Sequence, residues 1–364
     1  MPHRIVQAFI LCLTVIVLPL TGISTQSPTA PRQPDHGPGG KDYSHNRVIR
    51  TRYGEGAQEY WIFEPDAPKP RSSPLIIFLH GWGGTNPMYY GAWLEHLVKR
   101  GNIVVYPRYQ SDLLTPRSEF VPNTIRAIKN AIGRLQTERG HVRPDLNRFA
   151  VVGHSLGGLL AADVAVLGSE SGLPQVRAIM CVEPGITEYP ISIPLADLGK
   201  IRSETLLLAV AGEQDTLVRD TDAKKIYYES TRVPARNKDF ITLVSDTHGT
   251  PALNANHRAP TAPDKSYDNG ESTTRGGAKG PESAGGLRGA LSQVLRRSRR
   301  GPSELRTADA LDFYGTWKLF DGLCDAAFYG KNREYALGNT SQQRFMGVWS
   351  DGVPVKQLRV ISTP

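Results

Sequence analysis

The sequence contains few of the residues that build disulfide scaffolds and metal centres. Its 364 residues include only three cysteines and nine histidines. Three cysteines are too few for a disulfide framework. Because no His, Cys, Asp and Glu residues recur at metal-ligand spacing, we expect neither a metal nor another cofactor. We interpret Cys181 and Cys324 as buried free thiols, with a disulfide between them as the less favoured alternative.

The chain also carries only a modest excess of positive charge. The chain has 43 Lys and Arg against 35 Asp and Glu, a net charge of +8, and 39% of its residues are hydrophobic, which is enough for a large core. Residues 257–310 hold ten Lys or Arg and six Asp or Glu, a net charge of +4. The rest of the chain shows no basic patch interleaved with aromatic residues, so we expect no nucleic-acid partner.

One long apolar run is present, at the N-terminus. His3 and Arg4 precede an apolar stretch from Ile5 to Leu20, and small residues follow up to Ser24. This pattern is typical of a signal peptide over residues 1–24, which predicts a secreted or periplasmic protein. The alternative is an uncleaved membrane anchor, although the run is shorter than the roughly 20 residues that span a bilayer. Residues 25–40 are rich in Pro and Gly, and we expect a flexible leader there.

Strand-like apolar runs alternate with helical patterns from residue 48 onward. Val48–Tyr53 and Gln58–Phe63 indicate an antiparallel hairpin, and Leu75–Leu79 has the continuous apolar character of a buried strand. The alternation favours a mostly parallel central sheet with helices on both faces. We assign residues 41–258 to one domain, which a C-terminal helix and tail over residues 303–364 complete. The other expected strands are Ile103–Tyr106, Arg148–Val152, Val176–Val182, Thr205–Val210 and Asp239–Val244, and the expected helices are Tyr89–Lys99, Ile125–Leu135 and Gly158–Leu167.

Residues 259–302 depart from this pattern. They contain few large apolar residues, so we interpret them as a low-complexity, basic, solvated insertion. Leu287–Leu295 has helical apolar spacing, and four arginines follow between Arg296 and Arg300. Two other roles therefore stay open: weak contact with an anionic membrane surface, or a lid over a cleft.

The strongest chemical signal is the pentapeptide GHSLG at residues 153–157. It lies between the expected strand Arg148–Val152 and the expected helix Gly158–Leu167. In such a turn glycines on both sides relieve steric clash, and the serine hydroxyl stands clear of the sheet at a helix N-terminus. We interpret Ser155 as a nucleophile.

A serine nucleophile needs a base and an acid that orients the base. Asp215 follows the strand Thr205–Val210, and His248 follows the next strand, so both are expected at the carboxyl edge of the sheet with Ser155. Two alternatives stay open. Glu183 follows an earlier strand and could be the acid, and His257 could be the base if the last strand is misplaced.

The sequence also offers donors for a tetrahedral oxyanion. The segment HGWGG at residues 80–84 directly follows the strand that ends at Leu79. A backbone N–H of Trp82 could therefore pair with that of Leu156, directly after the candidate nucleophile.

On these residues the chain resembles α/β-hydrolase-fold serine esterases and lipases. GHSLG and HGWGG are the specific parts of the resemblance, which covers most of residues 48–330. Within that superfamily the chain is similar to exported bacterial esterases and to the cutinase, polyester-hydrolase and chlorophyllase-like group. The resemblance implies a carboxylic-ester hydrolase with an acyl-enzyme intermediate, Ser155 as nucleophile, Asp215 as acid, His248 as base, and Trp82 and Leu156 as oxyanion donors.

The sequence sets only a loose limit on the size of the substrate. Residues 184–204 are too few for a cap domain, so we expect an open cleft suited to a bulky or surface-bound ester. Trp82, Tyr89, Tyr90 and Trp93 form either an aromatic wall for it or part of the core. Peptide or amide hydrolysis and acyl transfer use the same triad, and a non-catalytic binding module of this fold is the rival of another class. Nothing in the sequence indicates the oligomeric state.

Overall fold

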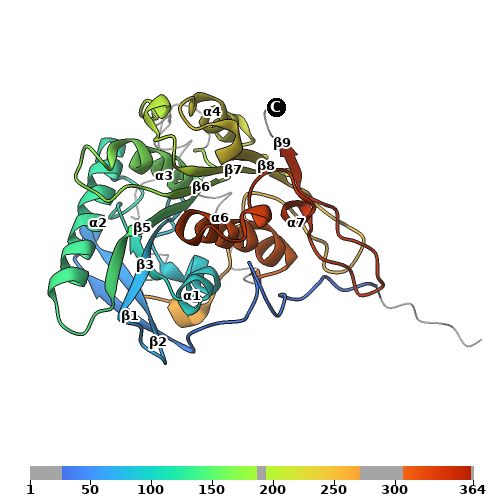
Figure 1. Ribbon diagram of the computed structural model, residues 1–364, viewed down its shortest axis with the longest axis horizontal. Helices are drawn as coiled ribbons and strands as arrows, with labels where there is room; N and C mark the ends of the chain where they lie inside the picture. The colour runs from blue at the N-terminus through green and yellow to red at the C-terminus, as the bar shows by residue number, and fades with distance from the viewer. Residues whose placement is uncertain (1–26, 187–193, 271–305, 362–364) are drawn as a thin grey trace, which may run out of the picture.

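The computed structural model describes residues 27–186, 194–270 and 306–361. Within these residues the chain forms a nine-stranded sheet in the order β1-β2-β4-β3-β5-β6-β7-β8-β9 (Figure 1). The strands are β1 (Arg47–Tyr53), β2 (Tyr60–Asp66), β3 (Ser72–Leu79), β4 (Ile103–Pro107), β5 (Arg143–His154), β6 (Ala178–Val182), β7 (Leu206–Gly212), β8 (Lys238–Leu243) and β9 (Arg359–Ile361).

Strands β3 to β8 pair in parallel, and the antiparallel pairs lie at the two ends of the sheet. β1 and β2 form the expected hairpin, in register from Arg47 opposite Asp66 to Tyr53 opposite Tyr60. β2 joins β4 antiparallel, and β9 runs antiparallel to β8 at the other edge. The prediction of a mostly parallel sheet with an N-terminal hairpin is therefore confirmed.

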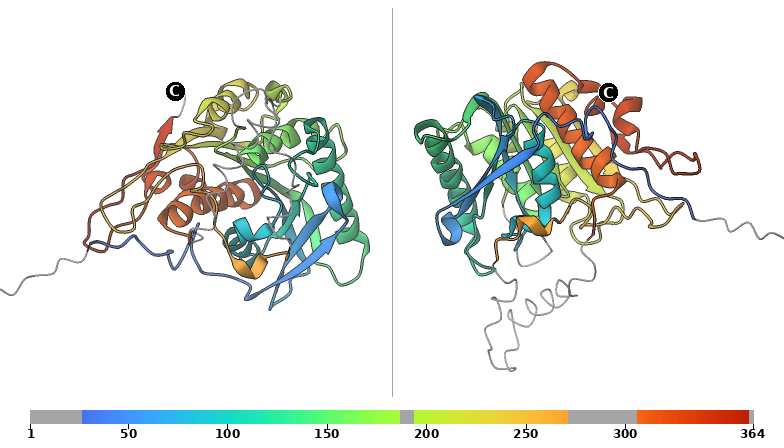
Figure 2. Two further views of the ribbon diagram at one scale, coloured as in Figure 1. Left: turned by 180° about the vertical axis from the view of Figure 1, so that it is seen from behind. Right: turned by 90° about the horizontal axis from the view of Figure 1, so that it is seen from below.

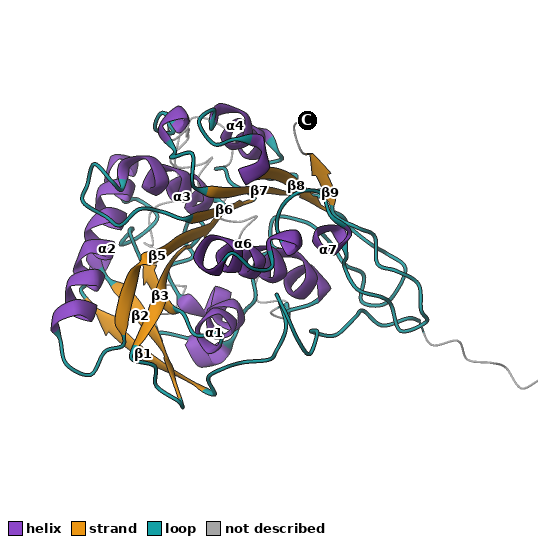
Figure 3. Ribbon diagram, viewed as in Figure 1, coloured by secondary structure: helices purple, strands orange, loops and turns teal. Residues whose placement is uncertain are grey.

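Helices cover both faces of the sheet, as Figures 1 and 3 show. α1 (Gly91–Lys99) and α6 (Lys318–Tyr329) lie on one face, and α2 (Phe120–Thr137), α3 (Leu156–Leu167) and α4 (Thr221–Glu229) lie on the other. A π-helical segment, Leu311–Trp317, leads into α6, and a short α7 (Ser341–Arg344) precedes the last strand. Short 3-10 helices occur at Gly56–Gln58, Pro87–Tyr90, Arg117–Glu119, Leu198–Lys200, Ala235–Asn237, Lys265–Tyr267 and Arg333–Tyr335.

Alternation of side chains along each strand divides the core into two layers. In β3, Ile76 and Phe78 belong to the layer under α1 and α6, whereas Leu75, Ile77 and Leu79 belong to the layer under α2, α3 and α4. All five side chains are fully buried. The continuous apolar run therefore marks a central strand that is covered on both faces.

Two segments expected to be loosely attached pack against the domain. In the Pro-rich leader, the Gly39 N–H donates to Asp321 in α6 at 2.7 Å. After residue 258, Tyr267 is buried, its hydroxyl donates to Glu95 at 2.6 Å, and the Arg50 guanidinium lies 3.5 Å from its ring centre. The expectation of a flexible leader is thus wrong for residues 27–40, and the segment around Tyr267 packs on the domain as well. The predicted signal peptide at residues 1–24 and the helical apolar spacing at Leu287–Leu295 fall outside the described residues.

Cys181 and Cys324 are both buried and free, as expected. Among the helices that the structure describes, none has the length and apolar content needed to cross a bilayer.

Close packing at the first turn of α3 gives a stability prediction. A Cβ added at Gly157 would lie 2.1 Å from the Leu79 carbonyl oxygen, whereas one at Gly133 in α2 would meet nothing within 4 Å. We expect Gly157→Ala to lower the free energy of unfolding by about 1–3 kcal/mol or more. Gly133→Ala should raise it by about 0.5–1 kcal/mol, because alanine is the better helix former. Urea denaturation of both variants checks this, and equal stabilities would contradict the packing described.

Candidate active site

Ser155 occupies a strained turn between β5 and α3. Its backbone has φ 58° and ψ −126°, a conformation that non-glycine residues rarely adopt. Its N–H donates to the Val182 carbonyl at the end of β6. A Cβ at Gly153 would lie 2.0 Å from the Gly157 carbonyl oxygen, so the turn closes only because the first residue lacks a side chain. The structure therefore places Ser155 where GHSLG predicted it, at the carboxyl ends of the parallel strands.

His257 connects Ser155 to Asp215. Nε2 of His257 lies 2.9 Å from the Ser155 Oγ, and Nδ1 lies 2.8 Å from Asp215 Oδ2. Since a carboxylate can only accept hydrogen bonds, Nδ1 carries the proton and Nε2 is free to accept from the serine hydroxyl. Serine, imidazole and carboxylate thus form one continuous hydrogen-bonded chain.

His248 does not belong to this chain, and its predicted place beside Ser155 is wrong. Its Nε2 lies 2.7 Å from Asp351 Oδ2, and the ring packs beside Trp349 with centroids 5.8 Å apart. The His248 side chain is 36% exposed. The alternative base, His257, holds the position that was expected for His248.

His257 rather than His248 lies beside Ser155 because of the path that the chain takes after β8. After β8 the backbone leaves the sheet, turns back on itself where Asp246 pairs with Leu253, and only then returns. On its return Ala255 accepts a hydrogen bond from the Gln214 N–H at 2.8 Å, beside Asp215. This contact at the strand edge brings His257 to the serine. His248 stays on the segment between β8 and Ala255, residues 244–254, which we call the excursion.

The excursion is held by segments that are distant in sequence. The Thr250 N–H donates to Pro28, and the Ser350 N–H donates to Thr29. Figures 1 and 2 show the yellow excursion and the red C-terminal loop running side by side away from the sheet, and the blue N-terminal segment meeting them at their far end.

The environment of Asp215 favours its ionised form. Burial alone would raise the pKa of this carboxyl. The hydrogen bond and charge of His257, together with the N–H groups of Val218 and Leu217, outweigh burial and hold the pKa below its usual value. Asp215 is therefore equipped to orient His257 and to stabilise a positive charge on it.

The HGWGG segment lies against the serine. A Cβ at Gly81 would lie 3.2 Å from the Ser155 Cβ. The Gly81 N–H donates to the Tyr90 hydroxyl at 3.1 Å, and the Gly83 N–H donates to Gln110 Oε1 at 3.0 Å. These two bonds anchor the loop on either side of Trp82. Within the described residues the N–H groups of Trp82 and Leu156 have no recorded acceptor, as oxyanion donors require.

A buried chain of polar groups joins this loop to the histidine segment. The Tyr90 hydroxyl lies 2.8 Å from Nδ1 of His154, and Nε2 of His154 lies 2.9 Å from the His257 carbonyl oxygen. Nε2 of His154 donates to this carbonyl oxygen, so Nδ1 accepts from the Tyr90 hydroxyl. That hydroxyl in turn accepts from the Gly81 N–H. Burial lowers the pKa of His154 to about 4, so the ring is neutral at neutral pH.

These roles were only partly visible in the sequence. Tyr90 and Trp93 are core residues rather than a cleft wall, and both pack on Phe78. His154 and His80 are hydrogen-bonded packing residues. Nothing in the local sequence pointed to the Tyr90 bridge, because its partners come from three separate segments.

Comparison with known proteins adds to this geometry. A family model described as Chlorophyllase matches residues 51–189. Over 124 residues the chain is 30% identical to Esterase LipI of Mycobacterium tuberculosis. The chain has the α/β-hydrolase fold. Its relatives indicate the esterase and lipase branch of that fold.

The extent of the two matches is limited. The alignment with the mycobacterial esterase covers 33% of this chain and 37% of the relative, so the chain spans well under half of that protein. The family match includes the HGWGG segment and Ser155 but ends before Asp215 and His257. The positions of these last two residues in the α/β-hydrolase come from the structure alone.

One group of side chains in the α/β-hydrolase offers metal-ligand atoms close together. His154, Glu183 and His257 each present one such atom, all within 4.8 Å of one another. Both imidazoles are already engaged, His257 with Asp215 and His154 with the His257 carbonyl oxygen. A metal ion would have to replace these hydrogen bonds, so the set fits a hydrogen-bonded network better than a metal centre.

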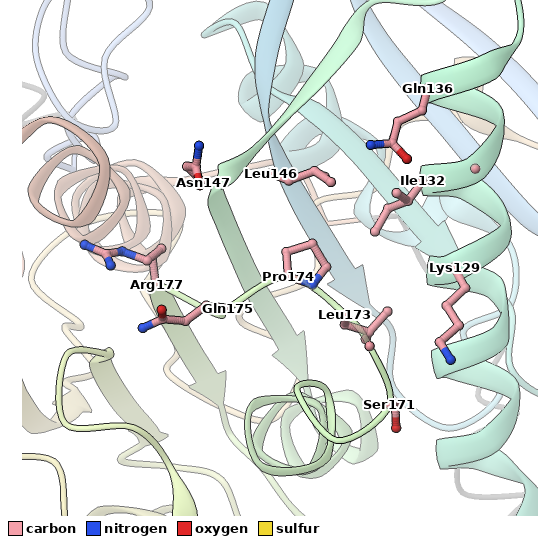
Figure 4. A pocket seen from close by; sticks show the side chains of 12 residues that line it. Lys129, Ile132, Gln136, Leu146, Asn147, Ser171, Leu173, Pro174, Gln175 and Arg177 are labelled. Carbon is pink, nitrogen blue, oxygen red and sulfur yellow. The ribbon is translucent and has the colours of Figure 1, made fainter.

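A hollow of about 790 Å³ lies elsewhere on the α/β-hydrolase. It is lined by α2, the start of β5 and the segment before β6, including Lys129, Leu146 and Arg177 (Figure 4). These segments lie at the amino ends of the parallel strands, opposite the edge that carries Ser155. The hollow therefore takes no part in the chemistry of the serine.

The buried imidazole of His154 gives a prediction of how the free energy of unfolding varies with pH. The folded-state pKa of His154 is about 4, below the roughly 6.5 of an unfolded histidine. The unfolded chain therefore binds the extra proton first, and stability is lost as pH falls from about 6.5 to about 4. We expect His154→Gln to reduce that slope by up to about 1.4 kcal/mol per pH unit. His36→Gln, on an exposed side chain, is the control. Urea denaturation from pH 4 to 7 checks the slopes, and an unchanged slope in His154→Gln would contradict the assignment.

Proposed function

We propose that this α/β-hydrolase is a secreted serine hydrolase that cleaves carboxylic esters through an acyl-enzyme. The observation that carries the proposal is the unbroken hydrogen-bonded chain from Ser155 through His257 to Asp215. Its position on a strained turn at the carboxyl edge of the sheet supports nucleophilic catalysis. The similarity to esterases favours an ester as the substrate.

In the proposed acylation, His257 takes the proton of Ser155 as Oγ attacks the ester carbonyl carbon. The ionised Asp215 accepts from Nδ1 and stabilises the imidazolium that forms. The negative charge on the former carbonyl oxygen is held by the N–H groups of Trp82 and Leu156. When the tetrahedral intermediate collapses, His257 protonates the leaving alcohol and the acyl group stays on Ser155.

Deacylation repeats these steps with water. His257 removes a proton from a water molecule that attacks the acyl carbon, and it returns that proton to Ser155 Oγ as the acid product leaves. The backbone around the serine does not need to rearrange, because the loop that carries Trp82 is tied at Gly81 and Gly83.

Exposed apolar side chains next to the site favour a substrate with a large apolar part. Leu217, two residues after Asp215, is 48% exposed, and Leu114, after β4, is 79% exposed. Leu113 beside it lies against Gly83. A bulky or surface-bound ester would cover these side chains and gain the free energy of apolar burial. The signal-peptide pattern over residues 1–24 supports export.

Replacement of the nucleophile tests the proposed reaction. Ser155→Ala removes the attacking oxygen, so we expect kcat with p-nitrophenyl butyrate to fall at least about 10⁴-fold. Labelling by a fluorophosphonate probe should be lost with it. A folded Ser155→Ala variant that keeps its activity would refute the assignment. A panel of esters and matched amides then separates an esterase from an amidase.

Paired histidine variants test which imidazole is the base. His257→Ala should lower kcat about as strongly as the serine variant, because members of a triad act as a unit. His248→Ala removes only a partly exposed contact with Asp351 and should leave kcat within about twofold. The same ester assay checks both, with thermal unfolding to show that each variant is folded. The reverse ranking would mean that the excursion after β8 takes another path in solution.

A further inference from the structure

A second carboxyl group lies beside His257 and has no part in the proposed mechanism. Glu183 follows β6, and its side chain is fully buried. Its Oε2 lies 3.6 Å from Nδ1 of His257, the nitrogen that Asp215 engages at 2.8 Å. The same oxygen lies 3.6 Å from Nε2 of His154. Nδ1 of His257 therefore faces two carboxyl groups.

The surroundings of Glu183 do not satisfy its carboxyl group. Within the described residues neither Oε1 nor Oε2 has a hydrogen-bond partner. The ionisable groups that act on it are His257 and Arg306, which favour its charge, and Asp215, which opposes it. Burial dominates, and with Asp215 it holds the pKa of Glu183 well above its usual value. Burial and the charge of Asp215 thus both favour the protonated form of Glu183.

The backbone holds this carboxyl group in place at some cost. Glu183 has φ 44°, in the left-handed region that glutamate seldom adopts. Its N–H donates to the Val210 carbonyl at 2.7 Å, which ties the turn to β7. A Cβ at Gly212 would lie 2.5 Å from Glu183 Oε1, so the space for the carboxyl group depends on a residue without a side chain. A strained, unpaired, buried acid at this position calls for a functional reason.

We propose that Glu183 is a positioning residue for His257, an alternate acceptor for the proton on Nδ1. While Asp215 is present and ionised, it holds Nδ1–H, and Glu183 stays 3.6 Å from that nitrogen. When the Asp215 charge is removed, the repulsion that opposes ionisation of Glu183 is lost and its carboxyl accepts Nδ1–H, which requires the gap to close from 3.6 Å to a hydrogen-bond distance. The inference rests on the proposed function, because it concerns the same histidine.

Two single variants and their double variant test this inference. In a triad without an alternate acceptor, Asp→Asn lowers kcat by about 10⁴-fold. With Glu183 in reserve, we expect Asp215→Asn to lower kcat/KM for p-nitrophenyl butyrate only about 10–100-fold. Asp215→Asn/Glu183→Gln should reach the full loss of about 10⁴-fold. Glu183→Gln alone should stay within about threefold of the parent, because Asp215 then holds the histidine.

A matched control and a pH profile separate this role from a structural one. Glu213 lies on the same loop as Asp215. Its carboxyl group accepts hydrogen bonds from the Ser245 N–H and from Arg359 rather than from His257. Asp215→Asn/Glu213→Gln should therefore match Asp215→Asn. An ionised Glu183 accepts Nδ1–H more strongly than a protonated one, and only the ionised form compensates a positive charge on His257. The activity ratio of Asp215→Asn to Asp215→Asn/Glu183→Gln should consequently rise from acid to alkaline pH, which a purely structural effect would not produce.

Equal activity of Asp215→Asn and Asp215→Asn/Glu183→Gln across the pH range would overturn the inference. If the glutamine variant does not fold, Glu183→Met replaces it, since the unbranched side chain fits an irregular space and offers no acceptor. Ser155→Ala distinguishes failure of the inference about Glu183 from failure of the proposed function. If it is inactive while the Glu183 substitution has no effect, the serine hydrolase stands and only the role of Glu183 is lost.

Discussion

The positive φ at Ser155 is the constraint on which the site depends. A non-glycine residue keeps this conformation only when its surroundings over-determine it. Here the serine N–H is bound to the end of β6, and the glycines on either side let the turn pack on itself and against the end of β3. Three parallel strands thus meet at one residue. The hydroxyl, the first N–H of α3 and the HGWGG segment share one edge because this turn closes.

Environment rather than residue type separates the histidines at this edge. His154 is enclosed between Tyr90 and the carbonyl of His257, and burial keeps it neutral. His257 has a carboxylate on one nitrogen and a hydroxyl on the other, so a positive charge on its ring would lie beside the negative charge of Asp215. The neutral ring of His154 links the Gly81 N–H, through the Tyr90 hydroxyl, to the backbone of His257 and thereby connects the HGWGG segment to the segment that carries His257.

The parts of the fold that local patterns encode could be predicted from the sequence. Apolar runs gave the parallel strands, and GHSLG gave Ser155 because the strained turn needs glycines at set positions. Asp215 lies within three residues of the end of β7, so little chain intervenes that could move it. His257 lies fourteen residues after β8, and proximity to a strand end therefore favoured His248. The packing of residues 27–40 and of Tyr267 was likewise missed, because polar and Pro-rich segments carry no periodicity that signals long-range contacts.

The excursion after β8 shows why the base could not be placed locally. Asp246, at its root, accepts from the indole N–H of Trp349 at 3.1 Å and from the Lys356 N–H at 3.0 Å, and these bonds help to lower its pKa against the effect of burial. Trp349 is itself buried in the layer under α1 and α6. The path from β8 to His257 is therefore set by C-terminal residues about a hundred positions away. The C-terminal segment does more than close the sheet with β9, because its contacts decide which of two histidines reaches the serine.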